Sequence, residues 1–153
     1  MRTIIIEVIP HKNQRYSTCG DWQLPNPDTL AITVSDTGND RSNMLVAIHE
    51  LVEALLCMSQ GISPEMVDAQ GISPEMVDDW DIHGLGSQMN EPGEHPGAPY
   101  HWQHRAADIV ERIVCMQFGM SWLLHETLVE DLFKDESKAI PDERGLPPPF
   151  SGL

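Results

Sequence analysis

Two runs of strand-like pattern mark the first part of the chain. Residues 3–9 (TIIIEVI) are rich in β-branched side chains and end at Pro10, and residues 30–34 (LAITV) alternate as a half-buried strand does. The polar stretch between them has room for a further strand at residues 14–18. These segments predict a small N-terminal antiparallel sheet.

A buried helix is predicted at about residues 43–60. Between residues 44 and 58 the sequence reads MLVAIHELVEALLCM, in which every position is apolar except the His and the two Glu of HELVE. This is the pattern of a helix that is covered on nearly all sides. Ser42 or Asn43 is available as its N-cap, and Gly61 is placed to end it.

A literal repeat follows this helix. QGISPEMVD opens both residues 60–69 and residues 70–79, so nine identical residues recur with a period of ten. Two short copies do not make a solenoid, and we interpret them as a duplication or an insertion. Each copy has a Gly that stops a helix, a Ser that caps one and a Pro at the first helical position. We expect one copy to start a helix and the other to form an extra turn or loop.

The second half of the chain predicts two further helices. One covers about residues 100–118, a break is expected at Gly119, and the next covers about residues 121–134. The segment 140–153 is rich in proline and is expected to be loosely ordered. The whole pattern, a sheet first and three to four helices after it, predicts a single α+β domain at residues 1–139.

Composition narrows the classes of function. Nine Lys and Arg face 24 Asp and Glu, and the resulting net charge of −15 disfavours direct binding to nucleic acid or to acidic membranes. Three widely spaced cysteines suggest neither a disulfide framework nor a cysteine zinc site. No export signal or apolar run of about 18 residues is apparent. These features favour a protein of the reducing cytoplasm.

HELVE places three metal-capable side chains inside the apolar helix. His49 and Glu53 lie one above the other at i and i+4, and Glu50 lies to one side. A carboxylate in such surroundings must be protonated, paired or bound to a metal ion. In HExxH zinc enzymes two His bind the metal and the Glu activates metal-bound water. By that logic His49 and Glu53 are metal ligands and Glu50 is the catalytic base, whereas the alternative is a metal-free hydrogen-bonded cluster.

Two resemblances extend this interpretation. The order of strand, polar turn and motif-bearing helix at residues 30–57 resembles small zincin-type metallopeptidases, which implies zinc and a hydrolytic activity. The segments HELVEALLC, GISPEMVDDWD and APYHWQHRAADIVE resemble a group of small uncharacterised phage-encoded proteins. That group has one GISPEMVD-like segment, which supports the insertion, and implies no particular activity.

A third ligand must come from another segment, because one helix face supplies only two. Candidates follow in three later regions: Asp81 and His83; His95; and His101, His104, Asp108 and Glu111. The predicted metal ligands are His49, Glu53, His104 and Asp81. A second HE pair, at His125, has its next carboxylate at i+5, which points elsewhere, and receives no function.

The last four candidates form a stripe at i, i+3, i+7 and i+10 of the third predicted helix. The apolar stripe of that helix, which includes Ile109, lies nearly opposite, so that the four polar residues could face water. Alternatively, the edge with His104 and Glu111 packs against the first helix. His101 and Asp108 would then be more exposed or lie behind the ligands.

Three hypotheses for function remain. The first is a zinc-dependent hydrolase that acts on a peptide, amide or phosphoester. The second is a nucleotide pyrophosphatase, because Glu50-x-x-Glu53 and Asp108-x-x-Glu111 resemble the paired acidic motifs of MazG-type enzymes, which implies Mg or Mn. The third is an acidic phage-type inhibitory protein that binds a host protein, with a structural metal or none.

Overall fold

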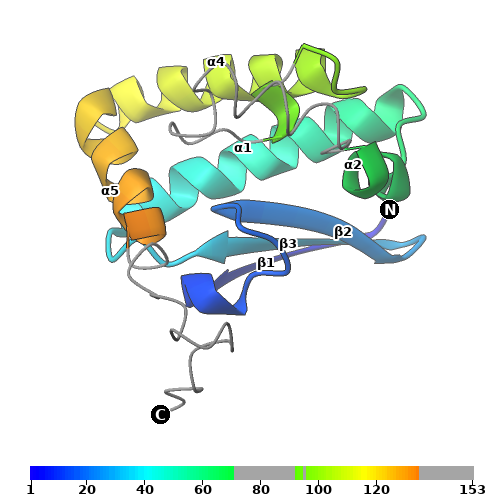
Figure 1. The fold of residues 1–153 in the computed structure, drawn as a ribbon, viewed down its shortest axis with the longest axis horizontal. Coiled ribbons are helices and arrows are strands. Elements are labelled where there is room, and N and C mark those ends of the chain that lie inside the picture. The colour runs from blue at the N-terminus through cyan, green and yellow to red at the C-terminus, as the bar shows by residue number, and fades with distance from the viewer. Residues whose placement is uncertain (71–91, 95, 135–153) are drawn as a thin grey trace, which may run out of the picture.

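The chain folds into a small sheet covered by helices (Figure 1). The computed structural model describes residues 1–70, 92–94 and 96–134. The elements are β1 (Thr3–Ile9), η1 (His11–Asn13), β2 (Gly20–Asn26), β3 (Thr29–Ser35), α1 (Asp40–Ser59), α2 (Pro64–Gln70), η3 (Pro92–Glu94), α4 (His101–Gln117) and α5 (Trp122–Lys134). The predicted α+β class, with the sheet first and the helices after it, is confirmed.

The sheet is mixed rather than wholly antiparallel. Its order is β1-β3-β2, with β1 parallel to β3 and β2 antiparallel to β3. Because β2 lies on the far side of β3, the chain crosses from one edge of the sheet to the other and returns to the centre. The alternating side chains Leu30, Ile32 and Val34 of β3 are buried beneath α1.

The second strand lies further along the chain than predicted. Residues 14–18 form no strand, and β2 begins at Gly20 instead. Pro25 lies within this segment, and an edge strand tolerates proline because one side of its backbone needs no ladder hydrogen bonds. Trp22 fixes β2 in place, since its side chain is buried in the core.

Helix α1 lies between the sheet and α4 (Figure 1). Its N-cap is Asn39, whose side chain accepts a hydrogen bond from Ser42 N at 3.1 Å, so the expected caps Ser42 and Asn43 were wrong. Three residues of early α1 were thus missed, because the apolar pattern begins only after the first turn. Gly61 and Gly119 take left-handed φ values of 73° and 64°, where α1 and α4 end as predicted.

The first copy of the repeat starts a helix. Pro64 opens α2, and the Ser63 hydroxyl accepts a hydrogen bond from Met66 N at 3.2 Å. The second copy, from residue 71 onward, lies outside the described residues, as does the tail at residues 140–153. The insertion therefore stays a prediction.

Among the described residues, α1 is the one helix that is long and apolar enough to cross a membrane. More than half of that apolar stretch is buried inside the fold. A core helix of a soluble protein has this composition, because it is covered by the sheet on one side and by another helix on the other.

Substitution of Leu45 tests the position of α1. This side chain is fully buried, whereas its neighbour Met44 is 55% exposed. We expect Leu45→Ala to lower the free energy of unfolding by about 2–5 kcal/mol, because it removes buried apolar volume. Met44→Ala, the matched control on the same turn, should change it by less than about 0.5 kcal/mol. Urea denaturation measures both, and equal effects would place α1 differently.

Candidate metal centre

The polar side of α4 faces α1. His49, Glu50 and Glu53 on α1 are 6%, 5% and 5% exposed, and His104 and Glu111 on α4 are 2% and 6% exposed. Of the two orientations that the sequence left open, α4 has the one in which His104 and Glu111 turn inward. The polar groups of each helix are the partners that the other requires, because buried charges are stable only when paired.

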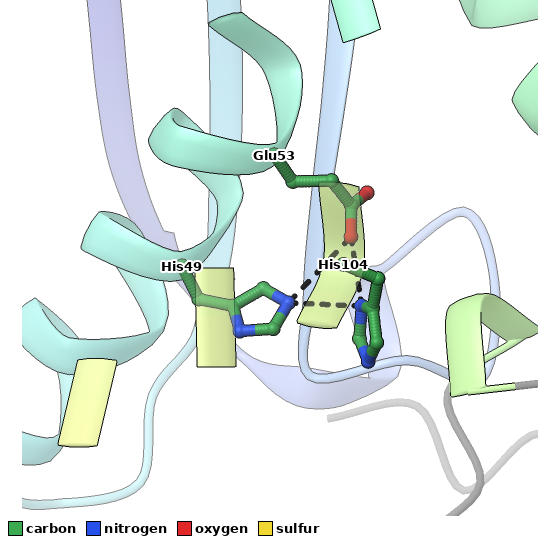
Figure 2. Close-up of side chains that lie close together, drawn as sticks. All are labelled: His49, Glu53 and His104. Carbon is green, nitrogen blue, oxygen red and sulfur yellow. Dashed lines mark hydrogen bonds and ion pairs between the residues drawn. The ribbon is translucent and has the colours of Figure 1, made fainter. Parts of the chain in front are cut away.

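Three potential ligand atoms converge between the two helices (Figure 2). His104 Nδ1 lies 2.8 Å from Glu53 Oε2 and 3.1 Å from His49 Nε2, and the latter two atoms are 3.6 Å apart. Zinc holds N and O ligands at about 2.0–2.2 Å, which puts neighbouring ligands of a tetrahedral site about 3.3–3.5 Å apart. The predicted trio His49, Glu53 and His104 therefore fits a zinc ion after only small adjustments.

The hydrogen bonds of His49 also favour a cation beside its Nε2 atom. His49 Nδ1 lies 2.9 Å from Glu111 Oε2 and 3.4 Å from Asp108 Oδ1, so this nitrogen carries a hydrogen and donates it. The other nitrogen, Nε2, then faces a carboxylate oxygen and a second imidazole. Lone pairs would repel one another there unless a proton or a metal cation lies between them.

A chain of hydrogen bonds continues behind His49. Glu111 Oε1 accepts from His125 Nε2 at 2.7 Å, and His125 Nδ1 lies 2.8 Å from Ser42 Oγ. The sequence interpretation gave His125 no function, and the structure places this buried residue in a hydrogen bond with Glu111. Carboxylates that orient a metal-binding His are a recurrent part of such sites.

Strand β2 supports the carboxylates of α1. Trp22 Nε1 donates to Glu53 Oε1 at 3.1 Å, which leaves Oε2 directed at the two imidazoles. Gly20 lies against Glu50, and a Cβ at that position would be 2.6 Å from the carboxyl carbon. Gly93 lies against the ring of His104 in the same way. Both glycines are therefore required for close packing around the site.

The electrostatics of the metal-free cluster favour positive charge at its centre. Burial opposes protonation of His49, but hydrogen bonds to Glu111 and Glu53 and the charge of Glu50 hold the pKa of His49 well above its ordinary value. Burial also disfavours the Glu53 anion, yet bonds from His104 and His49 lower the pKa of Glu53 to about 2. Burial and the nearby carboxylates raise the pKa of the Cys57 thiol to about 12, so this neighbour is a poor metal ligand.

A cavity of about 140 Å³ adjoins the cluster. His49, Glu50 and His104 line it, and exposed Arg105 and Arg112 lie at its rim. This volume holds a few water molecules. Two of the three residues of the trio, His49 and His104, therefore lie at the wall of this cavity.

The other candidates take less central positions. His101 is partly exposed and its Nδ1 lies 2.9 Å from the carbonyl oxygen of Gly93, and the side chain of Asp108 is 23% exposed. Both match the prediction that they lie behind the ligands or nearer to solvent. Two further groups could hold a metal: His49 with Asp108 and Glu111, and Glu94 with His104 and Asp108. Only the first trio is wholly buried.

Three predicted candidates fall outside the described residues: Asp81, His83 and His95.

No protein-family model, curated protein or solved structure matches this chain. The chemistry of the site therefore has to be inferred from its own geometry.

If the cluster holds zinc, the zinc affinity should depend on pH, because the ion would replace the proton at His49 Nε2. Below the raised pKa of His49, each pH unit gained should increase zinc affinity about tenfold for one proton released. When a chelator removes the metal, the proton on His49 stabilises the folded protein instead. This stabilisation is complete below pH about 6.5, the pKa of His in the unfolded chain, and is lost as the pH rises through the raised pKa of the folded state. Competition with a chromophoric chelator measures the zinc affinity, and denaturation in EDTA measures the stability; a zinc affinity that does not depend on pH would contradict the prediction.

Loss of His125 should weaken metal binding from a distance. His125→Ala removes the donor that orients Glu111 toward His49, and changes behind a ligand typically lower metal affinity by about 10–100-fold. The matched control is His11→Ala, which removes an imidazole that bonds to Ser35, outside the cluster. Isothermal titration with zinc compares the two variants, and equal affinities would show that the chain behind His49 has no influence on the metal.

Proposed function

We propose that the protein is a zinc-dependent hydrolase whose metal is held by His49, Glu53 and His104. The observation that carries the proposal is the convergence of His49 Nε2, Glu53 Oε2 and His104 Nδ1 within 3.6 Å of one another beside a cavity. Three protein ligands and an open position are the arrangement of catalytic zinc sites, whereas structural sites have four protein ligands. Zinc supplies Lewis acidity, which polarises a carbonyl and acidifies water.

Glu50 is the general base in this proposal. Its carboxylate lines the same cavity and is adjacent in sequence to a metal ligand. Gly20 allows the carboxylate to lie against β2, which restricts it to the cavity wall. From that position Glu50 can accept a proton from the attacking water and return it to the leaving group.

A peptide is the substrate class that the surroundings favour. Strand β2 contacts the site through Gly20 and Trp22, and among the described residues it pairs with another strand on one side only. Gly20, Asp21 and Trp22 are buried, so an extended peptide would add through its backbone along residues 23–26, the more exposed part of this edge. We expect the reaction in the cytoplasm, since none of the three cysteines is joined in a disulfide.

A second candidate is a magnesium-dependent nucleotide pyrophosphatase. Its supporting observation is that Asp108 and Glu111 approach His49 from α4, so that the acidic pairs of α1 and α4 meet in one cluster. Magnesium prefers oxygen ligands, and the imidazoles of His49 and His104 at the centre favour zinc instead. An acidic inhibitory protein, the third hypothesis, would need neither the cavity nor Glu50.

Elemental analysis of the purified protein with three variants tests the proposal. We expect one zinc per chain in the wild type and in Glu50→Gln, because the base is not a ligand, and loss of zinc in His49→Ala. Peptide hydrolysis should fall by about 10²–10⁴-fold in Glu50→Gln, the range for loss of a general base. Glu65→Gln, an exposed carboxylate on α2, is the control and should retain both properties.

Two results would contradict the proposal. Wild type without any bound metal, and with stability unchanged by chelator, would remove both enzyme hypotheses and favour the inhibitory protein. Magnesium-dependent hydrolysis of nucleoside triphosphates without zinc would favour the pyrophosphatase.

A further inference from the structure

The outer face of α4 is apolar and exposed. Trp102, Ile109, Ile113 and Met116 are 78%, 61%, 54% and 75% exposed. At 100° per residue these four side chains lie within about 60° of one another, so they form one stripe along the helix. Large apolar groups that gather on one exposed face mark an interaction surface, whereas single exposed ones need no explanation.

The orientation of α4 explains why this stripe lies outside. An amphipathic helix normally turns its apolar side to the core, but α4 turns His104, Asp108 and Glu111 toward α1 to complete the metal centre. The apolar side must therefore point away from the domain. The described residues of the chain leave it uncovered, although it has the composition of a core-facing surface.

We propose that a second copy of this chain covers the stripe through an antiparallel pairing of α4 with α4 of the partner. Two members of the stripe are symmetric about Ile109, because Trp102 lies seven residues before it and Met116 seven residues after it, whereas Ile113, four residues after, has Arg105 as its counterpart four residues before. A two-fold axis at Ile109 places each Trp102 on the Met116 of the other chain, a favourable sulfur–aromatic contact. The seven-residue spacing is also that of helices that pack side by side.

The stripe is large enough for a dimer. Its four side chains present about 500 Å² of apolar surface, at roughly 100 Å² for each aliphatic residue and about 200 Å² for Trp. A typical specific interface buries about 800 Å² on each partner, of which about 57% is apolar, so each partner contributes about 460 Å² of apolar surface. The apolar surface of the stripe is therefore of the size that a dimer interface requires.

The charges next to the stripe permit this pairing. Arg105 lies 3.9 Å from Asp108, and Arg112 lies 4.0 Å from Glu126 while its guanidinium stacks over Trp122. Each arginine therefore has an acidic partner in its own chain, which reduces repulsion across the axis.

Sedimentation equilibrium on the full chain tests the proposal. We expect a particle of twice the 17.1 kDa chain mass. Ile109→Glu should yield the single-chain mass, because the axis brings two carboxylates together. The matched control, Met44→Glu, places the same charge on an exposed apolar position of α1 and should remain dimeric. Circular dichroism checks that both variants fold. A monomeric wild type, or a dimer in Ile109→Glu, would overturn the proposal.

Cross-linking tests the register independently. In a Cys19→Ser background, Ile109→Cys should form a disulfide with itself across the axis, and so should the double variant Trp102→Cys with Met116→Cys. Trp102→Cys alone should not, because its neighbour in the partner is Met116. A cross-link in Trp102→Cys alone would indicate parallel helices and contradict the antiparallel arrangement.

Discussion

The contact between the polar faces of α1 and α4 is the constraint on which this structure depends. Helix α1 buries two carboxylates and an imidazole, a costly arrangement unless opposite charges or donors meet them. Helix α4 supplies these partners through His104 and Glu111. The same groups converge on one point, where a proton or a metal cation must lie. The same side chains therefore hold α1 against α4 and form the candidate metal centre.

This constraint also fixes the elements at the border of the site. Strand β2 provides the indole of Trp22 for Glu53 and a glycine for Glu50, while α5 provides His125 for Glu111. Each contact restrains a group that faces the cluster, and Trp22 also belongs to the apolar core. The outward turn of the apolar side of α4 follows from the same requirement, since one helix cannot present its polar stripe inward and bury its opposite side in the same core.

Local patterns in the sequence predicted much of the fold and singled out His49, Glu53 and His104 in the site, but not His125. The apolar run around HELVE identified a buried helix, and Gly61 and Gly119 marked its end and the break between α4 and α5, because left-handed backbone favours glycine. Strand β2 was missed because Pro25 hides the alternation of an edge strand. His125 gave no signal in its own segment, since its partners Ser42 and Glu111 are 83 and 14 residues away. The inward side of α4 could have been inferred from the need of His49 and Glu53 for partners, which outweighs the usual preference of apolar stripes for the core.

Anomalous diffraction at the zinc absorption edge, from crystals of the zinc-loaded protein, is the most direct test of the proposed zinc site. We expect a single peak between α1 and α4, at about 2.0–2.2 Å from His49 Nε2, from a Glu53 oxygen and from His104 Nδ1, with Glu111 still bonded to His49 Nδ1. A peak at Asp108 and Glu111 without His49 Nε2, or no peak in this cluster, would contradict it.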